Sequence, residues 1–134
     1  MLTRDDLESY LIRMDLEYEE IAEGMYLVRS REEQLPIVVN HSPPLVVLRL
    51  KVMDLPETES SLEDLYRTLL QLNASDVVHG AYGIEEGELV LGLSLQLESL
   101  DYGEFQAALE SLQMAASSHV GTIKELLPSA PVGG

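Results

Sequence analysis

Apolar residues follow two different spacings along this chain, and the spacing predicts where helices and strands lie. A recurrence every three to four residues predicts a first helix that begins after Thr3 and runs to Met14. The same recurrence predicts a second helix over residues 60–73 and a last one from Asp101 to Leu127. Pro128 follows the last helix, and we expect it to end there. Three amphipathic helices therefore frame the chain.

The stretch between the first two helices changes to a period of two, which is typical of strands. Glu23-Gly24 is expected to form a turn. SPP at 42–44 interrupts the strand-like run that ends at His41. The strand-like runs here are 16–20, MYLVR at 25–29, IVVNH at 37–41 and LVVLRLKVM at 45–53.

A hairpin is predicted before the last helix, with DVVHGAYGI at 76–84, a turn at EEG and a strand over 88–97. We interpret the whole order as α-β-β-β-α-β-β-α. The short connections favour a mostly antiparallel sheet, so the expected fold class is α+β with two layers. One domain over residues 1–128 accounts for the length, and residues 129–134 are expected to form a disordered tail.

Five leucines alternate along the last predicted strand, at positions 89, 91, 93, 95 and 97. Because they share one face of the sheet, they need an apolar cover, and the long C-terminal helix is the nearest surface of matching length. The opposite face carries Val90, Gly92, Ser94 and Gln96, which are small or polar and hold no catalytic group.

Apolar side chains remain on the second face of the run over 45–53. Val46, Leu48, Leu50 and Val52 form its core-facing side. We expect Leu45, Val47, Arg49 and Met53 to form a partner-binding or dimer interface on the other side. An ordinary alternative is that the first helix covers these residues.

The charge of the chain limits its partners. It carries 24 acidic residues against eight Lys and Arg, for a net charge of −16, and it has neither Lys nor Arg from Thr68 to Ile123. Binding to nucleic acid or to an anionic membrane depends on basic residues, so we expect neither. The absence of cysteine suits a reducing compartment, and the acidic N-terminus does not resemble a signal peptide, so we expect a cytoplasmic protein.

Recognisable catalytic and cofactor motifs do not occur in the sequence. It has no GxGxxG, GxxxxGK[ST], GxSxG or HExxH pattern. His41, His79 and His119 lie on three different predicted elements, so only folding could bring them together into a metal site. We therefore expect no enzyme activity, no metal and no cofactor. The alternative is a small ligand sensor or enzyme that uses these histidines with carboxylates such as Glu85, Glu86 and Glu88.

The stretch LYRTLLQLNASDVVHGAYGIEEGELVLGLSLQLESLDYGEFQAALESL joins a helix ending in LN, a glycine-turn hairpin and an amphipathic last helix. In this pattern and in element order, the chain resembles the type III secretion chaperone-like superfamily, which includes the Tir chaperones (CesT-like) and the YbjN family. The resemblance spans Leu7 to about Leu127. It implies a two-layer fold, a homodimer, and binding of another protein as a chaperone or a YbjN-like regulator.

Overall fold

The computed structural model describes residues 1–29, 35–56, 62–77 and 79–127. The predicted tail at 129–134 lies outside these residues. The elements are α1 (Arg4–Arg13), β1 (Glu17–Ala22), β2 (Met25–Arg29), β3 (Ile37–Ser42), β4 (Leu45–Asp54), α2 (Glu63–Ser75), β5 (Ala81–Glu85), β6 (Glu88–Gln96) and α3 (Tyr102–Glu125).

The strands form one antiparallel sheet in the order β1-β2-β3-β4-β6-β5. The predicted α+β class and antiparallel sheet are confirmed. The order differs in one respect, since four strands rather than three precede α2. Gly24, at a positive φ of 74°, allows the tight turn that separates β1 from β2, and Ser42 ends β3 before the prolines.

The helix ends are set by local hydrogen bonds. Thr3 and Asp6 form the predicted capping box of α1, in which each side chain accepts a hydrogen bond from the other residue's backbone N–H. Hydrogen bonds to the Asp6 carboxyl, first from the backbone N–H of Thr3 and then from its side chain, lower the pKa of that carboxyl. At the start of α3, the Asp101 side chain accepts from the backbone N–H of Glu104.

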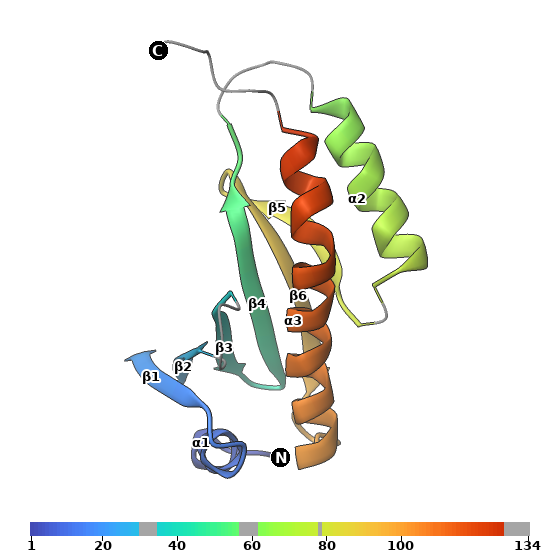
Figure 1. The fold of residues 1–134 in the computed structure, drawn as a ribbon. Coiled ribbons are helices and arrows are strands. Elements are labelled where there is room, and N and C mark those ends of the chain that lie inside the picture. The colour runs from blue at the N-terminus through green and yellow to red at the C-terminus, as the bar shows by residue number, and fades with distance from the viewer. Residues whose placement is uncertain (30–34, 57–61, 78, 128–134) are drawn as a thin grey trace.

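All three helices lie on the same face of the sheet (Figure 1). Helix α3 runs along β4 and β6, while α1 meets the start of α3 through contacts of Tyr10 with Tyr102 and Phe105. Helix α2 lies beside β5. The core between helices and sheet includes fully buried leucines at positions 7, 11, 48, 50, 65, 89, 91, 97 and 112.

The leucine row of β6 faces this core, as predicted, but its members are not equally covered. Leu89, Leu91 and Leu97 are fully buried, whereas Leu93 and Leu95 are only partly buried. Strand β5 pairs with β6 only as far as Gly92, so Leu93 and Leu95 lack a strand neighbour on that side, while the backbone of Leu97 is bonded to Leu2 and Pro44. Beyond that point β6 has a neighbour on one side alone. Among the described residues, no helix is long and apolar enough to cross a membrane.

Candidate functional site

The face of the sheet opposite the helices has no helical cover in the described part of the chain; we call it the open face. The strand register identifies its residues, because cross-strand partners point to the same side. Val47 pairs with Asn40 on β3 and with Ser94 on β6, and Leu45 pairs with Gln96. Leu45 and Val47 are half-buried, which is what neighbouring side chains of an uncovered sheet produce. Helix α1 does not cover them, because it lies on the other face of the sheet with α2 and α3.

Three of the four predicted interface residues lie together on the open face. They are Leu45, Val47 and Arg49. Met53 does not follow them, because a register shift between Lys51 and Met53 inserts an extra residue into β4. Met53 therefore pairs with the buried Leu89 and packs against the core from the helix side.

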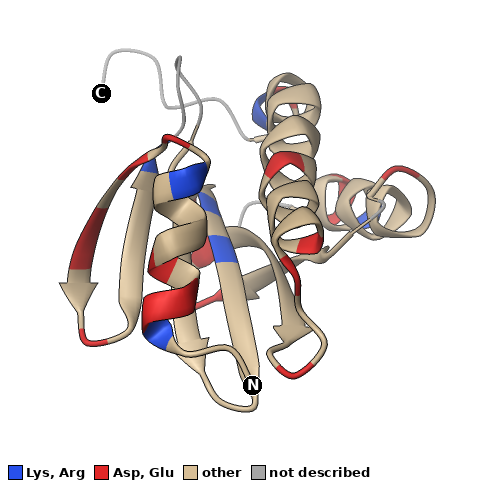
Figure 2. Ribbon diagram, turned by 90° about the horizontal axis from the view of Figure 1, so that it is seen from below, with Lys and Arg blue, Asp and Glu red and all other residues tan. Residues whose placement is uncertain are grey.

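Two basic residues in β4, Arg49 and Lys51, lie on the open face and are each paired with carboxylates. Arg49 forms an ion pair with Glu85 across β6. The Lys51 ammonium lies 2.9 Å from Glu88 and 3.0 Å from Asp54, and hydrogen bonds to these carboxylates raise the pKa of Lys51. Figure 2 shows these basic residues on the long strand β4 and acidic residues on β1 and at the turns. Glu85 and Glu88 thus serve as ion-pair partners in an exposed setting.

Apolar side chains surround these ion pairs. A shallow hollow of about 400 Å³ crosses β2, β3, β4 and β6 on the open face. A second one of about 310 Å³ lies over β4, β6 and β5. The apolar residues that line the two hollows include Leu27, Pro36, Val38, Val47, Ala81 and Val90. The open face therefore offers an apolar floor with neutralised charges.

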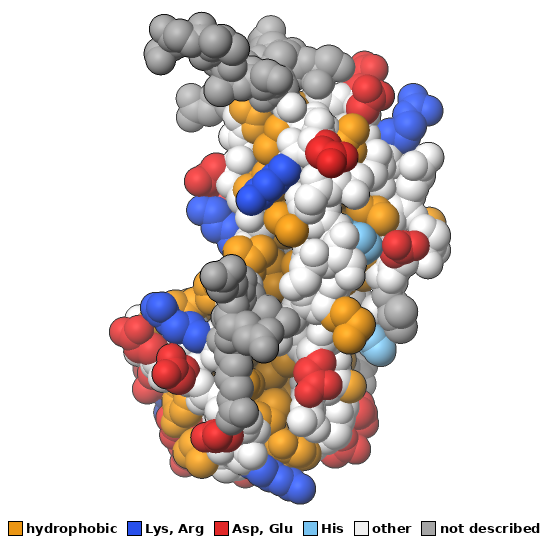
Figure 3. All heavy atoms as spheres, in the orientation of Figure 1, with side chains coloured by type: hydrophobic (Ala, Val, Ile, Leu, Met, Phe, Trp, Pro, Cys, Tyr) orange, Lys and Arg blue, Asp and Glu red, His pale blue; other side chains and the backbone are white. Residues whose placement is uncertain are grey.

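A second exposed apolar patch lies where α2 meets β5. It consists of Tyr66, Leu70 and Ile84, with exposed fractions of 39%, 69% and 53%. These residues line a hollow of about 220 Å³ whose other walls include Asn73 and Gly83. We call these three residues the α2–β5 patch. Figure 3 shows the side of the molecule on which α3 lies. Hydrophobic side chains on this side are interspersed with polar and charged ones.

The three histidines do not come together. The ring of His41 hydrogen-bonds the carbonyl of Leu2, and that of His79 lies 3.2 Å from the Ser111 hydroxyl. His119 is buried in α3 and binds Tyr82. Among the described residues, no three side chains of the metal-ligating types form a group that could hold an ion. The geometry gives no support to the alternative of a sensor or enzyme built from these histidines.

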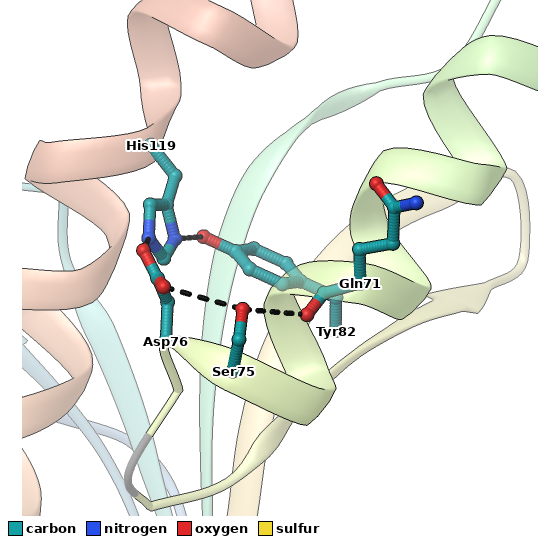
Figure 4. A network of polar contacts seen from close by, with 5 residues as sticks. All are labelled: Gln71, Ser75, Asp76, Tyr82 and His119. Carbon is teal, nitrogen blue, oxygen red and sulfur yellow. Dashed lines mark hydrogen bonds and ion pairs between the residues drawn. The ribbon is translucent and has the colours of Figure 1, made fainter.

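A polar network around His119 was not predicted from the sequence. The hydroxyl of Tyr82 lies 2.8 Å from His119 Nδ1, and His119 Nε2 lies 3.4 Å from the Asp76 carboxylate (Figure 4). Ser75 joins Asp76 to the backbone of Gln71. Burial raises the pKa of Tyr82 to about 12. One signal was present, because His119 falls three residues after Ala116 and four before Ile123 on the buried face of α3.

Sequence comparison decides the family. The family model CesT_Tir_1 matches residues 2–128. The chain belongs to the CesT_Tir_1 family. The predicted resemblance to secretion chaperones is therefore confirmed, and so is the prediction that a chaperone-like protein, not an enzyme, is encoded. Comparison with curated protein sequences found no match.

Solved structures share the fold at low sequence identity. A chain of the heterodimeric ExoU–SpcU complex from the type III secretion system of Pseudomonas aeruginosa has a TM-score of 0.70 at 18% identity, covering 90% of this chain and 97% of that one. YbjN, a proposed transcription regulator from E. coli, reaches 0.66 at 14% identity, covering 90% and 93%. The Yersinia pestis type III secretion chaperone SycH, in complex with a fragment of YscM2, reaches 0.62 at 17%, covering 87% and 98%.

Proposed function

We propose that this chain is a cytoplasmic, non-enzymatic binding module that holds an apolar segment of another protein on its open face. The observation that carries the proposal is the placement of all three helices on one side of the sheet. Half-buried Leu45 and Val47 are left without a cover on the other side. Membership of the chaperone family supports the same role, as do the complexes of similar folds with a second protein.

The charge distribution favours a net-basic segment. The chain carries a net charge of −16, while Arg49 and Lys51 on the open face are already paired with Glu85, Glu88 and Asp54. An approaching basic segment would be attracted by the whole molecule, and Arg49 and Lys51 would repel it little because carboxylates already pair with them. Apolar burial would then supply the affinity, and added salt should mainly slow association.

We further propose that the protein is a homodimer, with the α2–β5 patch as the contact between copies. The side chains of Leu70 and Ile84 are exposed and line one hollow together with Tyr66, and an exposed apolar patch of this kind is a candidate contact surface. The backbone of β5 is less available, because the Asn73 side chain already binds both the N–H and the carbonyl of Tyr82. The contact should therefore be made by side chains.

A YbjN-like regulatory role is compatible with this mechanism if the regulated molecule is a protein. Direct binding to DNA is disfavoured, because contacts with phosphate groups require basic residues. The chain has only eight Lys and Arg against 24 Asp and Glu. The same surface could therefore serve a secretion client or a regulated partner protein.

The experiment is a comparison of proteins recovered with the wild type and with two variants from native cells. Val47→Asp alters the open face, and Glu110→Gln, on the exposed side of α3, is the control. We expect a partner protein that is recovered with the wild type and with the control but not with Val47→Asp. The same partner, once purified, should bind the purified wild type. A partner retained equally by a folded Val47→Asp variant would contradict the proposed site.

A further inference from the structure

Three elements meet at the side chain of His119. The histidine belongs to α3, Tyr82 belongs to β5, and Asp76 is the residue at which α2 ends (Figure 4). The His119 side chain is 9% exposed and that of Asp76 is 57% exposed. The imidazole is thus almost fully buried, whereas its carboxylate partner Asp76 is open to solvent.

The donors and acceptors of this group fit a neutral imidazole. Because burial raises the pKa of Tyr82 to about 12, its hydroxyl keeps its proton at ordinary pH and can donate it. We infer that Nδ1 of His119 accepts this bond, so that Nε2 carries the ring proton and points towards the Asp76 carboxylate. Both ring nitrogens are then satisfied.

Two titratable side chains of the described residues are bonded to this ring. Asp76 is the titratable contact from α2, and Tyr82 is the titratable contact from β5. On the segment between them, the His79 ring is bound to Ser111. No Lys or Arg occurs from Thr68 to Ile123. Gain or loss of a proton by His119 itself therefore decides the pattern of bonds.

Protonation changes which element the histidine holds. In the imidazolium form both nitrogens donate, so the Tyr82 oxygen must accept and its own proton loses its acceptor. Asp76, in contrast, gains an ion-pair partner. We propose that His119 is a pH-sensitive latch: when neutral it satisfies the Tyr82 hydroxyl of β5, and when protonated it gains an ion pair with Asp76 at the end of α2 and leaves the buried hydroxyl proton of Tyr82 without an acceptor, which weakens β5. Because α2 and β5 carry the α2–β5 patch, an effect on dimerisation would follow, and that consequence alone rests on the proposed function.

The test is amide hydrogen exchange followed by NMR between pH 8 and pH 5, the range in which an ordinary histidine changes its charge. Rates are corrected for the intrinsic pH dependence of exchange, and the ring nitrogens of His119 are followed in parallel. We expect local opening of β5 to increase on the order of fivefold at the acidic end, the factor that one net hydrogen bond is worth. Amides at the end of α2 should become more protected.

Variants separate the two halves of the latch. Tyr82→Phe should abolish the response of β5 and leave that of α2, while Asp76→Asn should do the reverse. His79→Gln, which removes the neighbouring exposed histidine, should keep both responses.

The proposal is overturned if both responses persist in His119→Gln, or if the wild type shows none over this range, whether or not the ring takes up a proton. Should His119→Gln fail to fold, the Tyr82→Phe and Asp76→Asn pair still decides. Sedimentation at both pH values reports dimerisation separately, so a monomeric wild type would refute the dimer without touching the latch.

Discussion

Truncation of two leucines on β6 should have very different costs, although both belong to the same alternating row. Leu91 is fully buried and has Leu50 and Tyr82 as cross-strand partners on its two sides. Leu95 is partly buried and has only Val46 beside it, because β5 does not extend that far. Removing three carbons at about 0.8 kcal/mol each costs roughly 2.4 kcal/mol when burial is complete. With the cavity included, Leu91→Ala should cost about 3–4 kcal/mol, and Leu95→Ala about 1 kcal/mol.

Urea unfolding followed by circular dichroism measures both costs at one fixed protein concentration. The urea concentration at the midpoint should fall far more for Leu91→Ala than for Leu95→Ala. The slope of the unfolding free energy against urea concentration should stay the same. Ser94→Ala, exposed between the two positions, is the control and should stay within about 0.5 kcal/mol of the wild type. Equal costs for the two leucines, or a larger one for Leu95, would refute the assignment of β5 as a short strand.

Three further outcomes follow from the structure. Leu70→Asp should convert the proposed homodimer into a folded monomer in sedimentation experiments; a variant that stays dimeric would exclude the α2–β5 patch. Asp6, whose folded pKa is lowered, adds stability that is complete above its unfolded pKa and lost as pH falls through the folded pKa. Helix content measured by circular dichroism should therefore show an acid-dependent step below about pH 4 that is weaker in Asp6→Asn. Gly24→Ala should cost about 1 kcal/mol in urea unfolding, because φ is 74° and the added carbon meets Arg4; no loss would mean that the turn relaxes freely.

The sequence located most elements because each carries its own periodicity, but it indicated three strands instead of four before α2, and the strand expected over 76–84 is shorter, Ala81–Glu85. What it could not reveal depends on contacts between distant residues. LVVLRLKVM alternates without interruption, so nothing in it indicates the extra residue that turns Met53 towards the core; pairing with Leu89 decides that. The lack of a second strand neighbour beside Leu95 likewise depends on where β5 ends.

The candidate site shows the same division. Leu45 and Val47 were correctly placed opposite the core-facing residues, because alternation alone determines the two sides of a strand. Whether the first helix covered them was open in the sequence, and only the packing of α1 against α3 answers it. The bond between His119 and Asp76 joins residues 43 positions apart, a distance over which no local pattern operates.

The most direct test of the central claim compares aspartate at two adjacent positions of β4. Val46 is fully buried beneath the helices, and Val47 lies on the open face. Val46→Asp places an unpaired charge in the core and should cost more than about 4 kcal/mol or prevent folding. Val47→Asp should retain the wild-type circular dichroism and lose no more than about 1 kcal/mol, while binding of the partner recovered by the wild type disappears. If Val47→Asp unfolds the protein as severely as Val46→Asp does, the open face is part of an interior and the proposed binding surface does not exist.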